Sequence, residues 1–363
     1  TIVDAYDKLV AEGFISSHPG AGFHVEKKRH VPSNADEGLV EAEDNVSLLK
    51  AMLDKTLRIR AGDGRAPSSW TSDIMSELKT SAFPREKFDE IADFGSAMGY
   101  EYLREFISIR HQAQGMSLEP SQIITTFGAN NALDLIIRRF LVPGDTVFVD
   151  EPGYYPLFEK LKLAKVRMVG IPRTGSGPNV EVLKDYLKYE KPVLFFTQSL
   201  AQNPTGTSFD LTTANAVLGF AEKYEFLIVD DDPFIDIPGI KGTRLANLDN
   251  FNRVIYVGSV SKTLPAAFRF GYIACANEFI PALTDLKMIT AVNTSLITEM
   301  IIAKIYANNR YQKHLKRMSN RLIDGNNYVL NELSSLGLSP EYDPVNGFYF
   351  FVKLSGSNND IEL

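Results

Sequence analysis

Seven short apolar segments recur between residues 121 and 274 and alternate with helical patterns. They are rich in β-branched and aromatic residues, which is typical of strands buried on both faces of a sheet. The segments are 123–126, 146–149, 166–171, 193–197, 226–229, 254–257 and 272–274. This alternation predicts an α/β fold with a mixed, mostly parallel seven-stranded sheet and helices on both of its faces.

Apolar residues at helical spacing fill the intervals between several of these segments. A longer helical region runs from Glu278 to about Leu336 and is interrupted near Asn308. We predict that it leads into a smaller C-terminal α+β domain, residues 278–363. The shorter helices are expected at 130–141, 155–163, 180–188 and 211–224.

Composition limits the class of protein. The 363 residues predict two to three domains of about 150 residues each. The net charge of −7 argues against a general nucleic-acid coat. A single cysteine, Cys275, excludes a disulfide framework and a multi-cysteine metal site, and it favours the cytoplasm. No apolar run approaches the roughly 18 residues of a membrane helix. That absence predicts no membrane contact. The five histidines form no ligand pair, so we expect no metal site.

Two glycine-containing loops do not match nucleotide-binding motifs. Gly175-Ser-Gly177 lacks the third glycine of the dinucleotide fingerprint and predicts a turn. The segment from Gly258 to Thr263 superficially resembles a P-loop, but Ser261 precedes Lys262 and the upstream glycine is missing. A dehydrogenase-like or NTPase function is therefore disfavoured.

Five polar loops follow strands of the predicted sheet, at the point where each strand ends. Ligand sites in open α/β sheets collect at the carboxyl ends of the strands, so these loops predict one shared site. The first of them opens a helix with small residues, and its free N–H groups favour an anion. The loops carry Gly128-Ala129-Asn130, Tyr154, Asn203-Pro-Thr-Gly206, Asp231, and Ser259-x-Ser261-Lys262 with Arg269 seven residues later.

The order of these motifs resembles that of fold-type-I enzymes of pyridoxal 5′-phosphate (PLP), of the aminotransferase class I/II kind. The resemblance covers about residues 100–346. It implies that Lys262 forms the Schiff base with PLP and that Asp231 pairs with the pyridinium nitrogen. It also implies that Asn203 bonds the phenolic oxygen and that Tyr154 stacks on the ring. The implied phosphate cradle consists of Gly128, Ala129, Asn130, Ser259, Ser261 and Arg269.

Elementary chemistry agrees with these implied roles. Lysine forms an imine only as the free amine, so its surroundings must lower its pKa. A carboxylate beside the ring nitrogen keeps that nitrogen protonated, which lets the ring withdraw electrons from the substrate. An arginine and the N–H groups of a helix N-terminus neutralise a phosphate.

The chain departs from the family pattern at three places. Phe234 occupies the cofactor-binding position where the family usually has a tyrosine that bonds the phenolic oxygen. Phe94 stands where a tyrosine commonly reaches the phosphate of the neighbouring subunit. The family's arginine for the substrate carboxylate is expected beyond Leu363, after the glycine-aromatic segment Asn346-Gly-Phe-Tyr-Phe350.

The first 25 residues resemble the second half of a GntR-type winged helix, namely the end of the recognition helix and the wing hairpin. We expect the missing half upstream of Thr1. Placed before a PLP domain, this piece is similar to the MocR group of GntR regulators. The resemblance implies a homodimer that binds DNA through its winged helices and an amino compound at PLP.

Two hypotheses follow. The first is a MocR-like transcriptional regulator that senses an amino compound through PLP. The second is a working aminotransferase in which Lys262 also acts as general base, because the same site supports both. The predicted domains are a partial winged helix at 1–25, a linker at 26–50, a PLP-binding domain at 51–277 and the small domain at 278–363.

Overall fold

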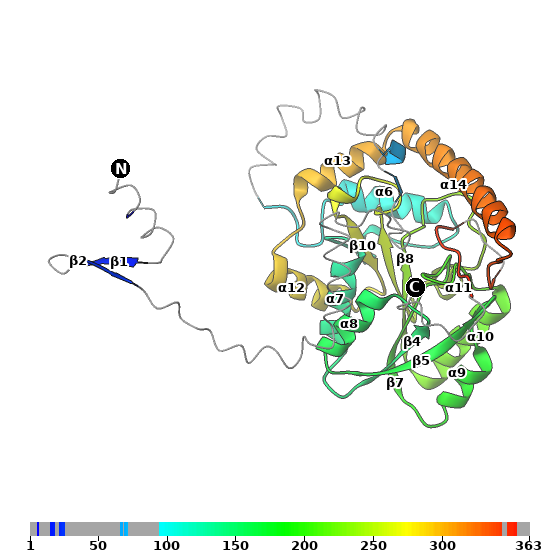
Figure 1. The fold of residues 1–363 in the computed structure, drawn as a ribbon. Helices are drawn as coiled ribbons and strands as arrows, with labels where there is room; N and C mark the ends of the chain where they lie inside the picture. Colours follow the sequence, from blue (N-terminus) through cyan, green and yellow to red (C-terminus); the bar gives the residue numbers. More distant parts are fainter. Residues whose placement is uncertain are drawn as a thin grey trace. The chain divides into compact units, whose positions relative to one another are not determined.

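The computed structural model describes residues 6, 15–18, 22–25, 66–67, 69–71, 94–342 and 347–353 (Figure 1). The chain divides into two units, Thr1–Thr56 and Leu57–Leu363. The predicted domain boundaries near residues 25, 50 and 277 stay predictions.

The first unit contains an antiparallel hairpin of β1 (Ile15–His18) and β2 (Gly22–Val25). Its register pairs Ile15 with Val25 and His18 with Gly22. The ring of Tyr6, a helical residue, lies 4.6 Å from the ring of Phe23. A hairpin therefore lies where the wing is predicted, but the winged helix itself stays a prediction. Most of the predicted recognition helix and the whole linker at 26–50 lie outside the described residues.

The described part of the second unit is built on one mixed sheet with the strand order β3-β10-β9-β8-β7-β4-β5-β6. Neighbouring strands from β9 through β5 run parallel, while β10 is antiparallel to both β3 and β9. The strands are β3 (Ile123–Thr126), β4 (Thr146–Glu151), β5 (Arg167–Thr174), β6 (Gly177–Pro178), β7 (Pro192–Thr197), β8 (Leu227–Asp232), β9 (Val254–Ser259) and β10 (Gly271–Ala274).

The predicted mixed α/β sheet is confirmed, but the strand number was one too low. The eighth strand is the two-residue β6, which pairs antiparallel with the end of β5. The turn predicted at Gly175 reverses the chain between them, and β5 continues through Thr174. Sequence periodicity cannot detect a strand of two residues, because alternation needs a longer segment.

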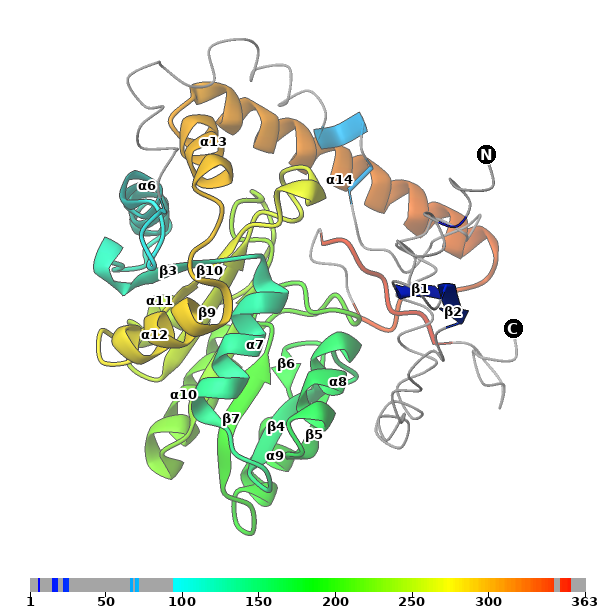
Figure 2. The ribbon, with the colours of Figure 1, turned by 90° about the vertical axis from the view of Figure 1, so that its left-hand side faces the viewer.

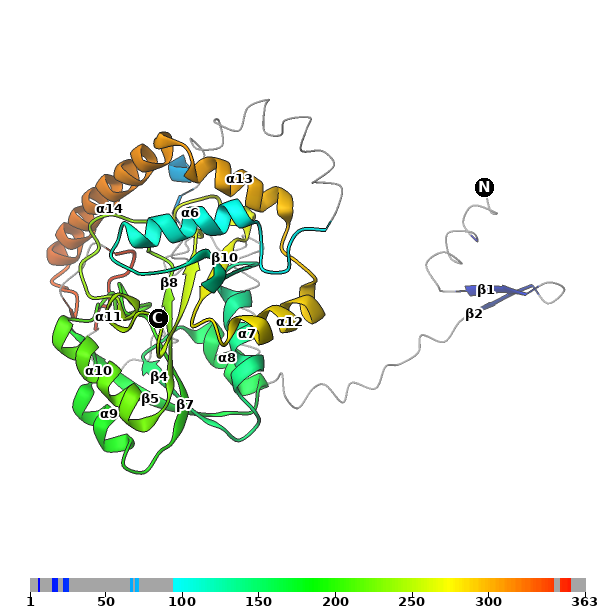
Figure 3. The same ribbon diagram turned by 180° about the vertical axis from the view of Figure 1, so that it is seen from behind.

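Each face of the sheet carries its own apolar core, because successive side chains of a strand point to opposite faces. On one face Val147 and Val149 of β4 pack in a cluster with α7, α8 and α12. On the other face Phe148 packs in a cluster with α6, α9, α10, α11 and α13. Figures 2 and 3 show the two helical layers from different sides.

The described helices agree with the predicted positions to within a few residues. The long C-terminal helical region has one more break than predicted, at Val292, which has a φ of 59°, and Ser295 then caps the next helix. The helices are α6 (Glu101–Gln112), α7 (Ala129–Phe140), α8 (Tyr155–Leu163), α9 (Val180–Tyr186), α10 (Leu211–Tyr224), α11 (Leu245–Asp249), α12 (Ile280–Ala291), α13 (Leu296–Tyr306) and α14 (Asn309–Ser335). Within the described ranges, no helix combines the length and apolarity needed to span a membrane.

Candidate cofactor-binding site

The loops that follow β3, β4 and β9 meet at one cavity of about 100 Å³. Phe270 and Pro265 close it on the side of the chain that leads to β10. Seven of the residues predicted from sequence line this cavity. They are Gly128, Ala129, Asn130, Tyr154, Ser259, Ser261 and Arg269.

The N-terminus of α7 forms one wall of this cavity. Gly128 is the residue before the helix and has a φ of 85°, a conformation that favours glycine. A Cβ at Gly128 would lie 3.1 Å from Nη2 of Arg269, so glycine lets the guanidinium approach the helix end. A helix N-terminus and a guanidinium together attract an anion.

The segment after β9 also lines this cavity. The hydroxyl of Ser259 donates to the carbonyl of Phe270 at 3.3 Å and accepts from the backbone N–H of Ser261 at 3.2 Å. Ser259 is buried, whereas Arg269 and Asn130 are exposed. This end of the site therefore presents polar groups that remain open to solvent.

Tyr154 also lines a second, smaller cavity of about 20 Å³ that contains Gln198 and Asp231. Its ring thus lies between the anion-attracting end and the carboxylate of Asp231. Burial raises the pKa of the Tyr154 hydroxyl, and the nearby Asp231 carboxylate raises it further. The Tyr154 hydroxyl is therefore neutral, and a neutral aromatic ring can stack on the flat ring of a ligand.

Asp231 lies near the end of β8 and is 9% exposed. Its Oδ2 accepts a hydrogen bond from Nε2 of Gln198 at 2.9 Å, while its Oδ1 is buried and has no partner among the described residues. Burial raises the pKa of Asp231 to about 6, and the positive charge of Lys262 opposes that rise. A cationic N–H facing Oδ1 would satisfy the unpaired oxygen and favour the carboxylate.

Asn203 begins the turn that follows β7. Its backbone N–H donates to Oε1 of Gln198 at 2.7 Å. Within the described ranges its side-chain amide makes no hydrogen bond, so the amide is available to a ligand. Gln202 holds the turn, because its Nε2 donates to the carbonyl of Pro152 at 2.9 Å and its Oε1 accepts from the hydroxyl of Thr205 at 2.6 Å.

Lys262 follows β9 and is partly buried. Its Nζ donates to the hydroxyl of Tyr349 at 3.5 Å and lies 5.9 Å from the centre of the Phe348 ring. The sequence did not identify Tyr349 as a contact of the lysine. The sequence feature that could have identified Tyr349 is the glycine-aromatic segment at 346–350, of which residues 347–350 are described.

Phe234 is fully buried and packs beside the same aromatic residues. Its ring stacks on Phe348 at 5.6 Å and meets Tyr349 edge-on at 6.3 Å. Phe234 lines neither of the two cavities. Its predicted contact with the cofactor stays a prediction, while its visible role is to support the two aromatic residues next to Lys262.

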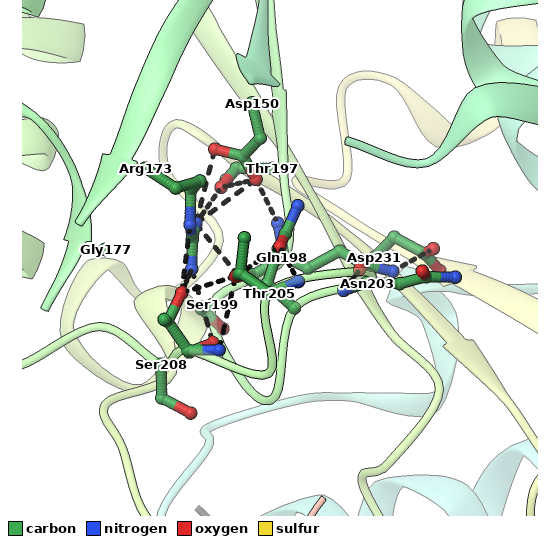
Figure 4. A network of polar contacts seen from close by, with 12 residues as sticks. Asp150, Arg173, Gly177, Thr197, Gln198, Ser199, Asn203, Thr205, Ser208 and Asp231 are labelled. Carbon is green, nitrogen blue, oxygen red and sulfur yellow. Dashed lines mark hydrogen bonds and ion pairs between the residues drawn. The ribbon is translucent and has the colours of Figure 1, made fainter. Parts of the chain in front are cut away.

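A buried ion pair braces the loop after β7 (Figure 4). Nη1 of Arg173 donates to both carboxylate oxygens of Asp150 at 3.2 Å, and to the carbonyl of Gln198 at 3.4 Å. Nη2 of Arg173 donates to the hydroxyl of Thr207 at 3.0 Å. The side chain of Arg173 is 0% exposed. The sequence did not identify Arg173, because the predicted strand ends at residue 171 whereas β5 continues through Thr174.

The residues present fit a phosphorylated pyridine aldehyde. One end offers an anion site, the other a buried carboxylate with an unpaired oxygen, and an aromatic ring lies between them. Lys262 lies near enough to Asp231 to affect its pKa, and Asn203 bonds Gln198, although neither Lys262 nor Asn203 lines the two cavities. In the described part of the chain, no group of three or more His, Cys, Asp or Glu residues could hold a metal ion.

Residues 68–362 match the family described as aminotransferase class I and II. The chain therefore belongs to this family, whose cofactor is pyridoxal phosphate. The structure is similar to that of kynurenine aminotransferase from Pyrococcus horikoshii, with a TM-score of 0.75 and 25% identity. That match covers 88% of this chain and 81% of the other, and the matched structure is a complex with PMP.

Relatives named as regulators match over more of the chain. The HTH-type transcriptional regulator NorG of Staphylococcus aureus is 25% identical over 93% of this chain and 78% of its own length. The uncharacterised HTH-type regulator YdfD of Bacillus subtilis is 24% identical over 98% of this chain and 76% of its own length. Aromatic-amino-acid aminotransferase 1 of Thermococcus litoralis is 28% identical over 77% of this chain and 66% of its own length.

Proposed function

We propose that the chain is a PLP-dependent transcriptional regulator whose aminotransferase-like part senses an amino compound and whose N-terminal part binds DNA. The observation that carries this proposal is the extent of the similarity. The family match begins at residue 68, whereas the similarity to YdfD extends over 98% of the chain and so includes most of the unit that holds the β1–β2 hairpin.

In this proposal each residue of the site has a separate task. Lys262 carries the cofactor, Asp231 holds a proton on the ring nitrogen, and Asn203 orients the phenolic oxygen. Tyr154 covers the ring. Gly128, Ala129, Asn130, Ser259, Ser261 and Arg269 hold the phosphate. Bound PLP supplies an electrophilic carbon for a primary amine and an electron sink for its α-carbon.

In the proposed sensing step, a primary amine would take the place of Lys262, and the lysine amine would be released. Release of the lysine amine would change its contacts with Tyr349 and Phe348, which lie on the segment after α14. A ligand shifts a conformational equilibrium only through such differential contacts. We propose that this change alters how two winged helices of a dimer engage DNA.

A second copy of the chain is the proposed partner of an apolar surface on α12 and α13. Met288, Ile289 and Val292 are 50%, 83% and 53% exposed, and Ile297 is 45% exposed. Such a run of exposed apolar side chains is typical of an interface. Sedimentation should give a dimer, and a monomer at high concentration would contradict this part. The single buried cysteine fits the proposed cytoplasmic location.

The alternative is an active aminotransferase, which the similarity to the Thermococcus litoralis and Pyrococcus horikoshii enzymes favours. Titration of the PLP-loaded chain with amino acids, amines and polyamines separates the two functions. A compound that shifts the visible absorbance band without release of a keto acid is a sensed effector. That compound should also change DNA binding. Conversion to the pyridoxamine form with a keto product would show a transaminase instead.

A further inference from the structure

Gln198 connects two residues that the proposed function assigns to the cofactor. Its Nε2 donates to Asp231, and its Oε1 accepts from the backbone N–H of Asn203. The residue is 7% exposed. We propose that Gln198 is a positioning residue that fixes the orientation and keeps the negative charge of Asp231. This inference rests on the proposed function, because it assumes that Asp231 faces the ring nitrogen.

The direction of the Gln198 amide is determined by its partners. The backbone N–H of Asn203 can only donate, so the oxygen of the amide must face it at 2.7 Å. The NH₂ group must then face Asp231 at 2.9 Å. An amide whose two ends are both paired in this way has one favourable orientation.

The backbone of Gln198 is held from the other side by the ion pair of Asp150 and Arg173. Its N–H donates to Oδ2 of Asp150 at 3.3 Å, and its carbonyl accepts from Nη1 of Arg173 at 3.4 Å. The neighbouring Thr197 donates its hydroxyl to the same Asp150 oxygen at 2.9 Å. Buried groups other than Asp231 therefore fix the backbone from which the amide extends (Figure 4).

A neutral donor at Oδ2 has a specific chemical consequence. It stabilises the carboxylate of Asp231 against the burial that raises its pKa. It adds no positive charge that would compete with a cationic ring N–H for the carboxylate. Oδ1, which is unpaired within the described residues, remains for that N–H. Gln198 thus directs one oxygen of Asp231 to itself and leaves the other to the cofactor.

Two substitutions test this role through PLP affinity, measured by the change in protein fluorescence. Gln198→Glu places a carboxylate against Asp231, so PLP should bind roughly ten- to hundred-fold more weakly than in the wild type at about pH 8. Near about pH 6 the two carboxyls share one proton, and the protonated Glu can again donate to Asp231. Most of the lost affinity relative to the wild type should then return. Gln198→Met has a similar length but no donor. Its defect should not shrink near about pH 6, because loss of the donor also favours protonation of Asp231.

Gln112→Glu is the matched control, because Gln112 is exposed on α6 and its side-chain amide donates to Ser108 and Leu118, away from Asp231. It should follow the wild type at both pH values. Equal PLP affinity of Gln198→Glu and wild type at about pH 8, or a defect of Gln198→Glu that pH leaves unchanged, would overturn the role of Gln198.

A second readout separates failure of this inference from failure of the proposed function. Thermal unfolding of the cofactor-free protein does not depend on PLP. There, Gln198→Glu should destabilise more at about pH 8 than at about pH 6, since two adjacent carboxylates repel each other. Wild type that never attaches PLP at Lys262 would refute the proposed function. Unfolding of Gln198→Glu that matches Gln198→Met at both pH values would refute the contact itself.

Discussion

The two ends of the candidate site are built differently. One end, around Asp231, is where the proposed function places the ring nitrogen of the cofactor, and we call it the ring end. Its four residues are each at most 9% exposed, and every one of them bonds at least one of the others: Asp231, Gln198, Asp150 and Arg173. At the phosphate end, the donors surround a cavity of about 100 Å³ and Arg269 is exposed. The ring end is therefore organised by folding itself, whereas the phosphate end holds open donors that a ligand would order.

The largest effect is expected where the ring end meets the fold. Arg173→Leu leaves the carboxylate of Asp150 buried and unpaired, which typically costs about 3–5 kcal/mol of unfolding free energy. Chemical denaturation of the cofactor-free protein measures it. Arg167→Leu on the same strand is the control, because its ion pair with Glu190 lies at the surface. Arg167→Leu should unfold like the wild type. Equal effects of the two substitutions would contradict a stabilising role of the ion pair between Asp150 and Arg173.

The next effect concerns the charge that the ring end supplies. Asp231→Asn keeps the shape but removes the carboxylate, so PLP affinity should fall roughly ten- to hundred-fold, as for a lost hydrogen bond between charged groups. Fluorescence titration measures it. The stability of the cofactor-free protein should not fall, because the substitution also removes a buried charge. Unchanged PLP affinity would show that Asp231 does not face the ring.

The pH dependence follows from the same carboxyl. Burial raises the pKa of Asp231 from 3.8 to about 6, so the folded cofactor-free protein binds more protons than the unfolded chain between these values. The stability contribution of Asp231 therefore falls as pH rises from 3.8 to about 6. PLP affinity should rise over the same range, since binding needs the carboxylate. Asp230, whose pKa burial raises to about 7, titrates over an overlapping range in both proteins, so the test is the difference between them. Asp231→Asn should lose less stability than the wild type over this range and should lack the rise in PLP affinity. A pH dependence of either quantity that equals that of the wild type would contradict the assignment.

A smaller effect is expected at the phosphate end. Arg269→Gln should weaken binding of PLP about ten-fold through one lost charged contact. It should leave binding of pyridoxal, which has no phosphate, unchanged. Stability should also stay near that of the wild type, because Arg269 is exposed. An equal loss for PLP and pyridoxal would place Arg269 away from the phosphate.

The smallest effect is expected at the contact between Lys262 and Tyr349. At 3.5 Å this hydrogen bond is long, so Tyr349→Phe should change PLP affinity by less than about three-fold. The ring that packs on Phe234 is retained by the substitution. Competition of the wild-type and variant proteins for a limiting amount of PLP resolves such a difference. A loss comparable with that of Asp231→Asn would show that the hydroxyl is a principal contact.

The two ends of the site also differ in how far the sequence predicts them. Each of the seven predicted strands has a counterpart in the structure, because buried strands are apolar and short whatever surrounds them. The phosphate end was predicted from the polar loops that follow strands, and seven residues of those loops do line one cavity. These features depend on local pattern and on the shared edge of the sheet.

The ring end was predicted less completely. Asp231 was identified by its motif, whereas Gln198 and Arg173 were not, because their partners lie on other strands and loops. A run of three aspartates after an apolar strand reads as a solvated cap when it is seen alone. In the structure all three are buried, with Asp230 bonded to Ser199 and Asp232 to Arg244. Tertiary partners, which spacing does not encode, decide their environment.

Whether Lys262 carries the cofactor can be measured directly. The PLP-loaded protein is reduced with borohydride, digested, and its peptides are mapped by mass spectrometry. We expect a single pyridoxyl label on Lys262, together with loss of that label in Lys262→Ala. A label on another lysine, or label retained in Lys262→Ala, would contradict this assignment.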